Sequence, residues 1–127
     1  MAAASFWDRE KQWPCNQPPR GELYAIDTRT GNVAWKVPFG SFPELEALAI
    51  HGAGTPSIGG VTATARGALF AAGTVDSKIR AFESKTGKEL WSADLETGAH
   101  AIPITYLGHD GKQYVAVMVS GGRVHER

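Results

Sequence analysis

The side chains with the clearest chemical potential lie in one short stretch, where Thr74, Asp76 and Ser77 fall between two predicted strands. A carboxylate flanked by hydroxyls in such a loop can serve a functional site, or it can cap its own turn through a local hydrogen bond. Arg80 follows on the next strand, where its guanidinium can pair with Asp76 or extend along the surface into water. The sequence alone leaves these alternatives open for the carboxylate and for the arginine.

Paired glycines mark two further candidate positions. Gly121 and Gly122 end a predicted apolar strand, and glycine there lets the backbone approach a flat ring closely. An ordinary loop would carry the same pair, and Gly59 and Gly60 show the same ambiguity. Cys15 is either a reactive thiol or a small packed apolar side chain.

Other common catalytic and binding patterns do not occur in the sequence. There is no G-x-S-x-G turn, no complete G-x-G-x-x-G loop and no phosphate-binding P-loop. The histidines lack the spacing of a metal site, so no metal ligand is predicted; they are His51, His100, His109 and His125. The residue patterns therefore assign no catalytic residue.

Length and composition limit the classes of protein that remain. The 127 residues suffice for one small domain or a piece of a larger one. Thirteen Lys and Arg balance thirteen Asp and Glu, which argues against a nucleic-acid-binding surface and a polybasic membrane tether. No apolar run is long enough for a transmembrane helix, and the N-terminal residues lack the apolar core of a signal peptide.

An internal repeat gives the main prediction about the fold. Residues 25–35 and 81–91 share the pattern A-x-[DE]-x-x-T-G-x-x-x-W, and residue 81 lies 56 positions after residue 25. A Thr-Gly turn between two apolar runs predicts a β-hairpin in each copy, because glycine supplies the left-handed turn residue. We expect Trp35 and Trp91 to pack on the alanine of a neighbouring unit. The alternative is two unrelated hairpins whose tryptophans share a common core.

Short strands around the repeat complete the predicted architecture, an all-β partial β-propeller of about two blades' worth of antiparallel four-stranded units. After an N-terminal extension or loop (1–21), the partial propeller occupies residues 22–122, and a tail (123–127) follows. Its predicted parts are a half blade (22–37), a connection with one or two helical turns (38–59), a full blade (60–94) and a second half blade (101–119).

The repeated hairpin resembles the tryptophan-docking motif of the eight-bladed quinoprotein dehydrogenases, which use pyrroloquinoline quinone (PQQ). Further stretches resemble the C-terminal part of the membrane-type glucose/quinate dehydrogenase branch; they are residues 14–23, 35–40, 54–60, 73–76, 80–82 and 111–115. The sequence departs from that pattern at Arg20, at Glu83, and after Gly122.

The resemblance implies a function and a set of site residues. A family member oxidises a sugar, polyol or other alcohol by hydride transfer to PQQ bound with calcium, while an Asp base removes the hydroxyl proton. Asp76, Thr74, Gly121 and Gly122 are the implied cofactor-binding residues. The implied location is the periplasm or the membrane surface, and the implied partners are the remaining propeller blades. The alternative is a non-enzymatic propeller scaffold or protein-interaction module.

Two further expectations concern the chain by itself. Because an incomplete propeller leaves strand edges open, we expect it to self-associate, to be inactive alone and to bind PQQ poorly. We also expect the Trp91 ring to be buried, so that its truncation would cost about 3–5 kcal/mol of stability. Finally, both sides of the strand near residues 112–119 are apolar, which predicts a strand covered by a layer on each face.

Overall fold

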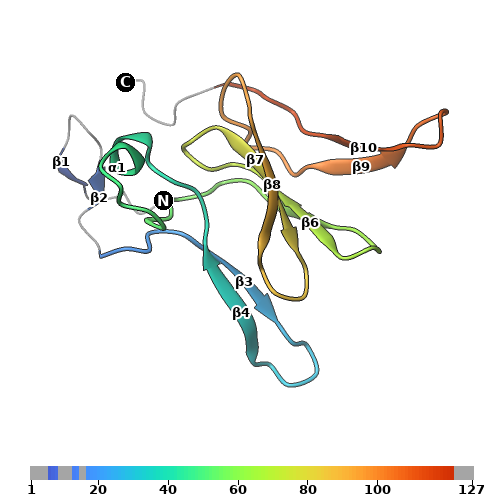
Figure 1. The fold of residues 1–127 in the computed structure, drawn as a ribbon, viewed down its shortest axis with the longest axis horizontal. Helices are drawn as coiled ribbons and strands as arrows, with labels where there is room; N and C mark the ends of the chain where they lie inside the picture. Colours follow the sequence, from blue (N-terminus) through green and yellow to red (C-terminus); the bar gives the residue numbers. More distant parts are fainter. Residues whose placement is uncertain (1–5, 9–12, 15–16, 122–127) are drawn as a thin grey trace.

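The computed structural model describes residues 6–8, 13–14 and 17–121, with side chains over 17–121. Its regular secondary structure consists almost entirely of antiparallel strands (Figure 1). Its centre is a four-stranded sheet in the order β5 (Val61–Ala63), β6 (Ala68–Ala71), β7 (Lys78–Glu83) and β8 (Glu89–Asp94). Each strand pairs with its sequence neighbour, which is the topology of one complete propeller blade.

Three two-stranded sheets accompany this blade. The pair β3 (Glu22–Ile26) and β4 (Val33–Pro38) precedes it, and the pair β9 (Ile104–Leu107) and β10 (Gln113–Ala116) follows it. A short pair, β1 (Phe6–Asp8) and β2 (Trp13–Pro14), lies in the segment predicted as an extension without strands. The predicted all-β fold class is therefore confirmed, with α1 (Pro43–Ala47) in the long connection between β4 and β5.

The two copies of the repeat form equivalent hairpins, as predicted. Ala25 lies opposite Trp35 in β3–β4, and Ala81 lies opposite Trp91 in β7–β8. Gly31 and Gly87 close the two turns with φ values of 75° and 73°, a left-handed conformation that glycine adopts without strain. The local sequence of each turn thus fixes the same register in both hairpins.

Trp35 docks on the turn of the second hairpin; that it also packs on an alanine stays a prediction. Its indole N–H donates a hydrogen bond of 2.9 Å to the carbonyl oxygen of Ser84, in the turn of the next hairpin. The ring lies against Gly87, where an added Cβ would come within 2.5 Å of it.

The prediction that Trp91 is buried is wrong, since 51% of the residue is exposed. Trp35 is covered because the Gly87 turn of the next hairpin lies against it, whereas no such turn lies against Trp91 among residues 17–121.

The strand β10 is covered on one face only, although the sequence predicts a layer on each face. Val115 and Val117 pack against the central blade, but Tyr114 and Met118, predicted to face a second layer, are exposed.

Apolar clusters on both faces of the central blade hold the sheets together. On one face, Phe39, Ala71 and Phe82 are buried, and the rings of Phe39 and Phe82 meet edge to face at 6.0 Å. On the other face, Ala72, Ile79 and Ala99 pack with side chains from the β10 segment. A separate small cluster under α1 contains Phe42, Leu45 and Ala53. The central four-stranded blade is therefore the layer against which both half sheets pack.

The Trp35 contact predicts a difference between two matched substitutions, Gly87→Ala and Gly31→Ala. Both place a side chain in a left-handed turn, which costs about 1–2 kcal/mol. Only the methyl group at position 87 meets the indole ring, because nothing in the described structure lies within 4 Å of a Cβ at Gly31. We expect Gly87→Ala to lower the free energy of unfolding by about 1–3 kcal/mol more than Gly31→Ala.

Urea unfolding measures this difference, at a protein concentration low enough that the midpoint no longer depends on concentration. Equal losses of stability in the two variants would contradict the docking of Trp35 on the Gly87 turn.

Candidate functional site

The loop between β6 and β7 holds a buried carboxylate at its centre. The Asp76 side chain is only 1% exposed. One of its oxygens accepts hydrogen bonds from the backbone N–H and the hydroxyl of Ser41, at 2.9 and 3.0 Å. The other accepts a bond of 2.6 Å from the Thr74 hydroxyl. The loop is thereby tied to the start of the connection that follows β4.

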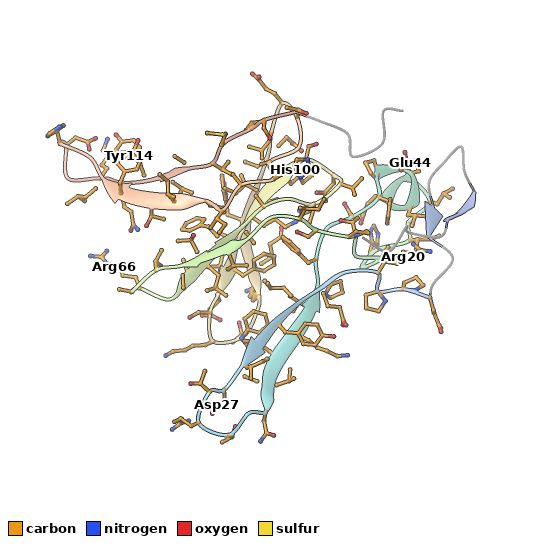
Figure 2. The ribbon with its side chains drawn as sticks, turned by 180° about the vertical axis from the view of Figure 1, so that it is seen from behind. Arg20, Asp27, Glu44, Arg66, His100 and Tyr114 are labelled. Carbon is orange, nitrogen blue, oxygen red and sulfur yellow. The ribbon has the colours of Figure 1, made fainter. Side chains whose placement is uncertain are left out.

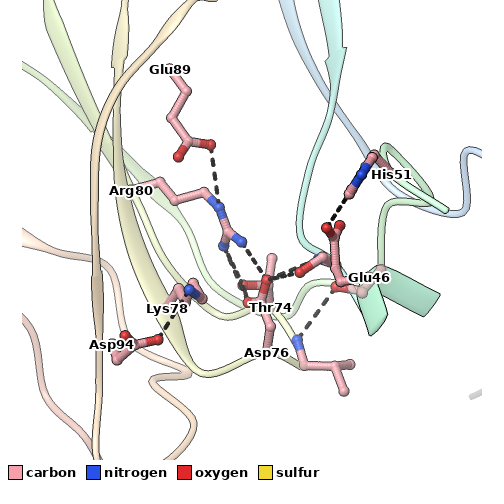
Figure 3. A network of polar contacts seen from close by, with 11 residues as sticks. Glu46, His51, Thr74, Asp76, Lys78, Arg80, Glu89 and Asp94 are labelled. Carbon is pink, nitrogen blue, oxygen red and sulfur yellow. Dashed lines mark hydrogen bonds and ion pairs between the residues drawn. The ribbon is translucent and has the colours of Figure 1, made fainter. Parts of the chain in front are cut away.

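Arg80 completes this cluster from the adjacent strand β7. Its guanidinium binds both oxygens of Asp76, one of them at 3.1 Å, and also donates to the Thr74 hydroxyl at 3.1 Å. Glu89 on β8 lies 3.5 Å from the Nε of Arg80, on the side away from Asp76 (Figure 3). Of the two roles that the sequence left open for Arg80, the structure shows the paired one, with its side chain 8% exposed.

The electrostatics of the cluster keep Asp76 ionised. Burial alone would raise the pKa of Asp76, but the hydrogen bonds from Arg80 and Thr74, the charge of Arg80 and the bond from Ser41 outweigh it. The pKa of Asp76 therefore lies below its ordinary value of 3.8. A carboxylate with a lowered pKa and both oxygens occupied is a weak proton acceptor, and it serves well as a fixed counter-charge.

An open hollow of about 680 Å³ lies beside this cluster, between the connection after β4 and the strands β7 and β8. Its walls carry both signs of charge, and Lys78 forms an ion pair of 3.1 Å with Asp94 across the strands. The lining residues are Pro38, Gly40, Ser41, Pro43, Glu46, Gly52, Asp76, Lys78, Arg80, Glu89, Ser92 and Asp94. The hollow could take a polar ligand only by competing with these internal pairs.

The glycines proposed from the sequence do not gather around Asp76. Gly121 is exposed, with a φ of 57°, and lies near Thr97 rather than near Asp76. Gly122 and Cys15 lie outside the described residues. Gly59 has a packing role, because an added Cβ would collide with the carbonyl oxygen of Ala72. The structure thus brings together Thr74 and Asp76 and places Gly121 elsewhere.

Ser41 and Glu89 belong to the cluster, but the sequence analysis did not single them out. Ser41 lies 35 residues before Asp76. The residues Ser41, Pro43 and Glu44 form a recognisable helix-start pattern, which predicts α1 but not its contact with a distant loop.

Outside the cluster, the imidazole of His51 pairs with the carboxylate of Glu46 at 2.6 Å. Over the described residues, no three His, Cys, Asp or Glu side chains gather in a metal-binding arrangement.

Comparisons with known proteins agree on one family. The family model described as "PQQ: Glucose/ethanol/alcohol dehydrogenase, beta-propeller domain" matches residues 1–115. A probable quinate dehydrogenase (quinone) from Xanthomonas campestris pv. juglandis is 44% identical over 116 residues, covering 87% of this chain. Quinoprotein glucose dehydrogenase A from Acinetobacter calcoaceticus is 40% identical over 112 residues, covering 85% of this chain.

A solved structure shows the same arrangement of strands. The quinohemoprotein alcohol dehydrogenase from Comamonas testosteroni superposes with a TM-score of 0.63 and 32% identity, covering 85% of this chain and 14% of that one. The chain spans 15% of the length of the quinate dehydrogenase and 14% of the length of the glucose dehydrogenase. The similarity thus concerns a small part of each relative.

The burial of Asp76 predicts a large effect of Asp76→Asn on stability. The substitution removes the buried carboxylate that binds Arg80 and leaves the guanidinium only the half-exposed Glu89, so we expect a loss of about 3–5 kcal/mol at pH 7. Since the pKa of Asp76 is lower in the folded chain, its contribution is complete above pH 3.8 and decreases as the pH falls through the folded value. The variant should lack this part of the acid dependence.

Asp110→Asn is the matched control, because the pKa of that carboxyl is also lowered, chiefly by the backbone N–H of Lys112, but its side chain is partly exposed. Urea unfolding from pH 7 to pH 3 measures both effects. A loss under 1 kcal/mol for Asp76→Asn at pH 7 would argue against a tightly coupled Asp76–Arg80 pair.

Proposed function

We propose, given that the chain belongs to the PQQ glucose/ethanol/alcohol dehydrogenase family of β-propeller domains, that it forms part of an enzyme that oxidises a sugar, polyol or other alcohol. The family resemblance noted in the motifs is confirmed by the match over residues 1–115. The observation that carries the proposal is the 44% identity to a quinate dehydrogenase, together with a complete blade of the same fold class.

The names of the relatives support a polyhydroxylated substrate. One relative is named for quinate and the other for glucose, and both compounds carry several alcohol groups on a ring. A non-enzymatic propeller scaffold receives no comparable support, because a BamB structure from Moraxella catarrhalis is only 19% identical, and such a likeness shows the fold alone. We therefore favour a sugar or polyol as the substrate class.

PQQ would supply the redox chemistry by accepting a hydride from the alcohol carbon. The polar groups of Thr74 and Asp76 are already bonded within the chain, so direct contact with a quinone would require these bonds to open. Both oxygens of Asp76 are occupied by donors from the chain, and the Thr74 hydroxyl donates to Asp76 while accepting from Arg80. These groups are therefore assigned no reaction step, and direct binding of the cofactor by Thr74, Asp76, Gly121 and Gly122 stays a prediction.

The arrangement supports a positioning role for Asp76 and Thr74. Through the carboxylate, the loop between β6 and β7 is fixed to Ser41, and the guanidinium of Arg80 is held in one orientation. A propeller loop held in this way presents a constant surface to whatever binds at that end of the blade. The two residues would then support a cofactor site without contacting the cofactor.

Partners and location follow the same proposal. The remaining blades of a propeller, or further copies of this chain, would cover the half sheets β3–β4 and β9–β10. The proposed location is the periplasm, either free or associated with a membrane. In the described part of the chain, no helix has the length and apolar character needed to cross a bilayer.

A chimeric enzyme tests the proposed function. The matching segment of the Xanthomonas quinate dehydrogenase would be replaced by this chain, and dye-linked oxidation of quinate measured with PQQ and calcium. We expect the chimera to retain PQQ-dependent activity, and a chimera carrying Asp76→Asn to bind PQQ at least 10-fold more weakly. A deletion of the segment is the negative control. A folded chimera with full PQQ loading and no oxidation of quinate, glucose or glycerol would contradict the proposal.

The isolated chain should bind PQQ weakly, because its polar groups at the blade end are already paired and its hollow is open. We expect a dissociation constant above about 100 μM in a fluorescence titration with calcium present. Saturable binding near 1 μM would show that the described residues form a cofactor site by themselves.

A further inference from the structure

The hollow beside the buried cluster has two walls, which belong to neighbouring sheets of this chain. One wall is the face of β7 and β8 on which Lys78 lies opposite Asp94 and Arg80 lies opposite Ser92. The other wall is the connection after β4, which contributes Glu46 (Figure 3). Its volume of about 680 Å³ falls within the range of about 300–1,000 Å³ that is usual for small-molecule sites.

The inner surface of the hollow is held in place by buried charge. Asp76 and Arg80 line it, although their side chains are only 1% and 8% exposed. Hydrogen bonds from Ser41 and Thr74 fix the carboxylate of Asp76 in one position. In the view of Figure 2, the hairpin tips marked by Asp27 and Arg66 lie well away from this end of the blade. A ligand would therefore meet a surface that is already ordered, so less conformational freedom is lost when it binds.

The exposed carboxylates of the hollow leave hydrogen-bond acceptors unused. Each of the three engages its partner in the chain through one oxygen only, in the pairs Asp94–Lys78, Glu89–Arg80 and Glu46–His51. Within the described part of the chain, the second oxygen of each carboxylate accepts no hydrogen bond from the protein. Ion pairs with such exposed partners contribute little to stability, so a ligand that competes for these carboxylates disrupts little.

The charges that line the hollow favour an uncharged ligand. Four carboxylates face two cationic groups, so an anionic ligand would meet an excess of negative charge. A cationic ligand would lie beside the ammonium group of Lys78 and the guanidinium of Arg80. An apolar ligand would remove water from all of these groups and replace none of its hydrogen bonds. Hydroxyl groups avoid these three penalties, because they donate and accept hydrogen bonds without adding charge.

We propose that the hollow binds an uncharged sugar or polyol. Hydroxyl groups of the ligand donate to the free oxygens of Glu46, Glu89 and Asp94. Other hydroxyls accept from the ammonium group of Lys78, and Ser92 contributes a hydroxyl that both donates and accepts. The inference goes beyond the proposed function, because it needs neither PQQ nor a reaction. Since the hollow is open, we expect a dissociation constant of about 1–10 mM.

Saturation-transfer difference NMR on the full chain measures binding of this strength, and association of the chain does not prevent it, because larger particles also give the effect. Two probes share a ring and differ in charge, namely glucose and glucuronate, each titrated to about 20 mM. We expect a saturable signal from glucose. Glucuronate should bind at least about 5-fold more weakly, because its carboxylate meets the excess of negative charge. Absence of a glucose signal would overturn the proposal.

A blocking substitution tests whether glucose binds in the hollow. Ser92→Phe places a ring in the wall opposite Arg80, so we expect it to weaken glucose binding at least about 10-fold. Ser120→Phe is the matched control, because Ser120 is also exposed but does not line the hollow. The control should bind glucose like the natural chain. Equal binding by the Ser92→Phe variant and the natural chain would overturn the proposal.

A charge variant gives a result that misfolding cannot imitate. In a double variant with Glu46→Gln and Asp94→Asn, two carboxylates remain against two cationic groups, and each new amide keeps an acceptor oxygen. We expect glucuronate to bind this variant at least about 5-fold more tightly than it binds the natural chain, while glucose binding changes by less than about 3-fold. Unchanged discrimination between the two probes would contradict the proposed binding mode.

Glucosamine distinguishes a sugar site from a site for cations, because its amino group is charged at about pH 6. We expect it to bind no more tightly than glucose at the same pH. Clearly tighter binding of glucosamine would identify a cation site and overturn the proposal. Each of these results leaves the chimera test of the enzyme function unaffected, because that test measures PQQ-dependent oxidation.

Discussion

The contact between the Trp35 indole and the Gly87 turn is the interaction on which the arrangement of the sheets depends. A two-stranded sheet such as β3–β4 has too little apolar surface to be stable alone, so it needs a neighbour. The indole supplies a large apolar surface and one directed hydrogen bond, to the Ser84 carbonyl, at the same place. Since Trp35 is held on strand β4 and Gly87 lies in a hairpin turn, the contact sets the distance and the angle between adjacent sheets.

The packing at the opposite end of the blade relies on close approach of backbones. Gly59 lies against the carbonyl of Ala72, and Gly54 lies against Gly21, so that no side chain fits between the segments. Strands this close leave little room for movement, which suits a fold whose blades must stack in a fixed order. The buried pair of Asp76 and Arg80 adds a polar anchor to this end, and Ser41 joins it to the connection that contains α1.

The buried charge cluster also defines what this part of the chain can contribute to catalysis. A carboxylate with five donor contacts and a lowered pKa holds its neighbours in place rather than exchanging protons. In the family to which the chain belongs, the cofactor carries the redox chemistry, and the protein provides position and charge. The Asp76 cluster fits that division of roles, because it fixes a loop and a guanidinium at the end of a blade.

The sequence by itself determined the hairpins, the repeat and the family. The Thr-Gly turns and alternating apolar residues act over a few positions, so Gly31 and Gly87 could be assigned to left-handed turns from local patterns alone. Only the tertiary structure decided that Trp35 docks on the Gly87 turn and the Ser84 carbonyl, that Trp91 is exposed, and that Ser41 donates to Asp76. These outcomes depend on contacts between segments about 35 to 50 residues apart, or on a neighbouring surface, and local spacing carries no information about either.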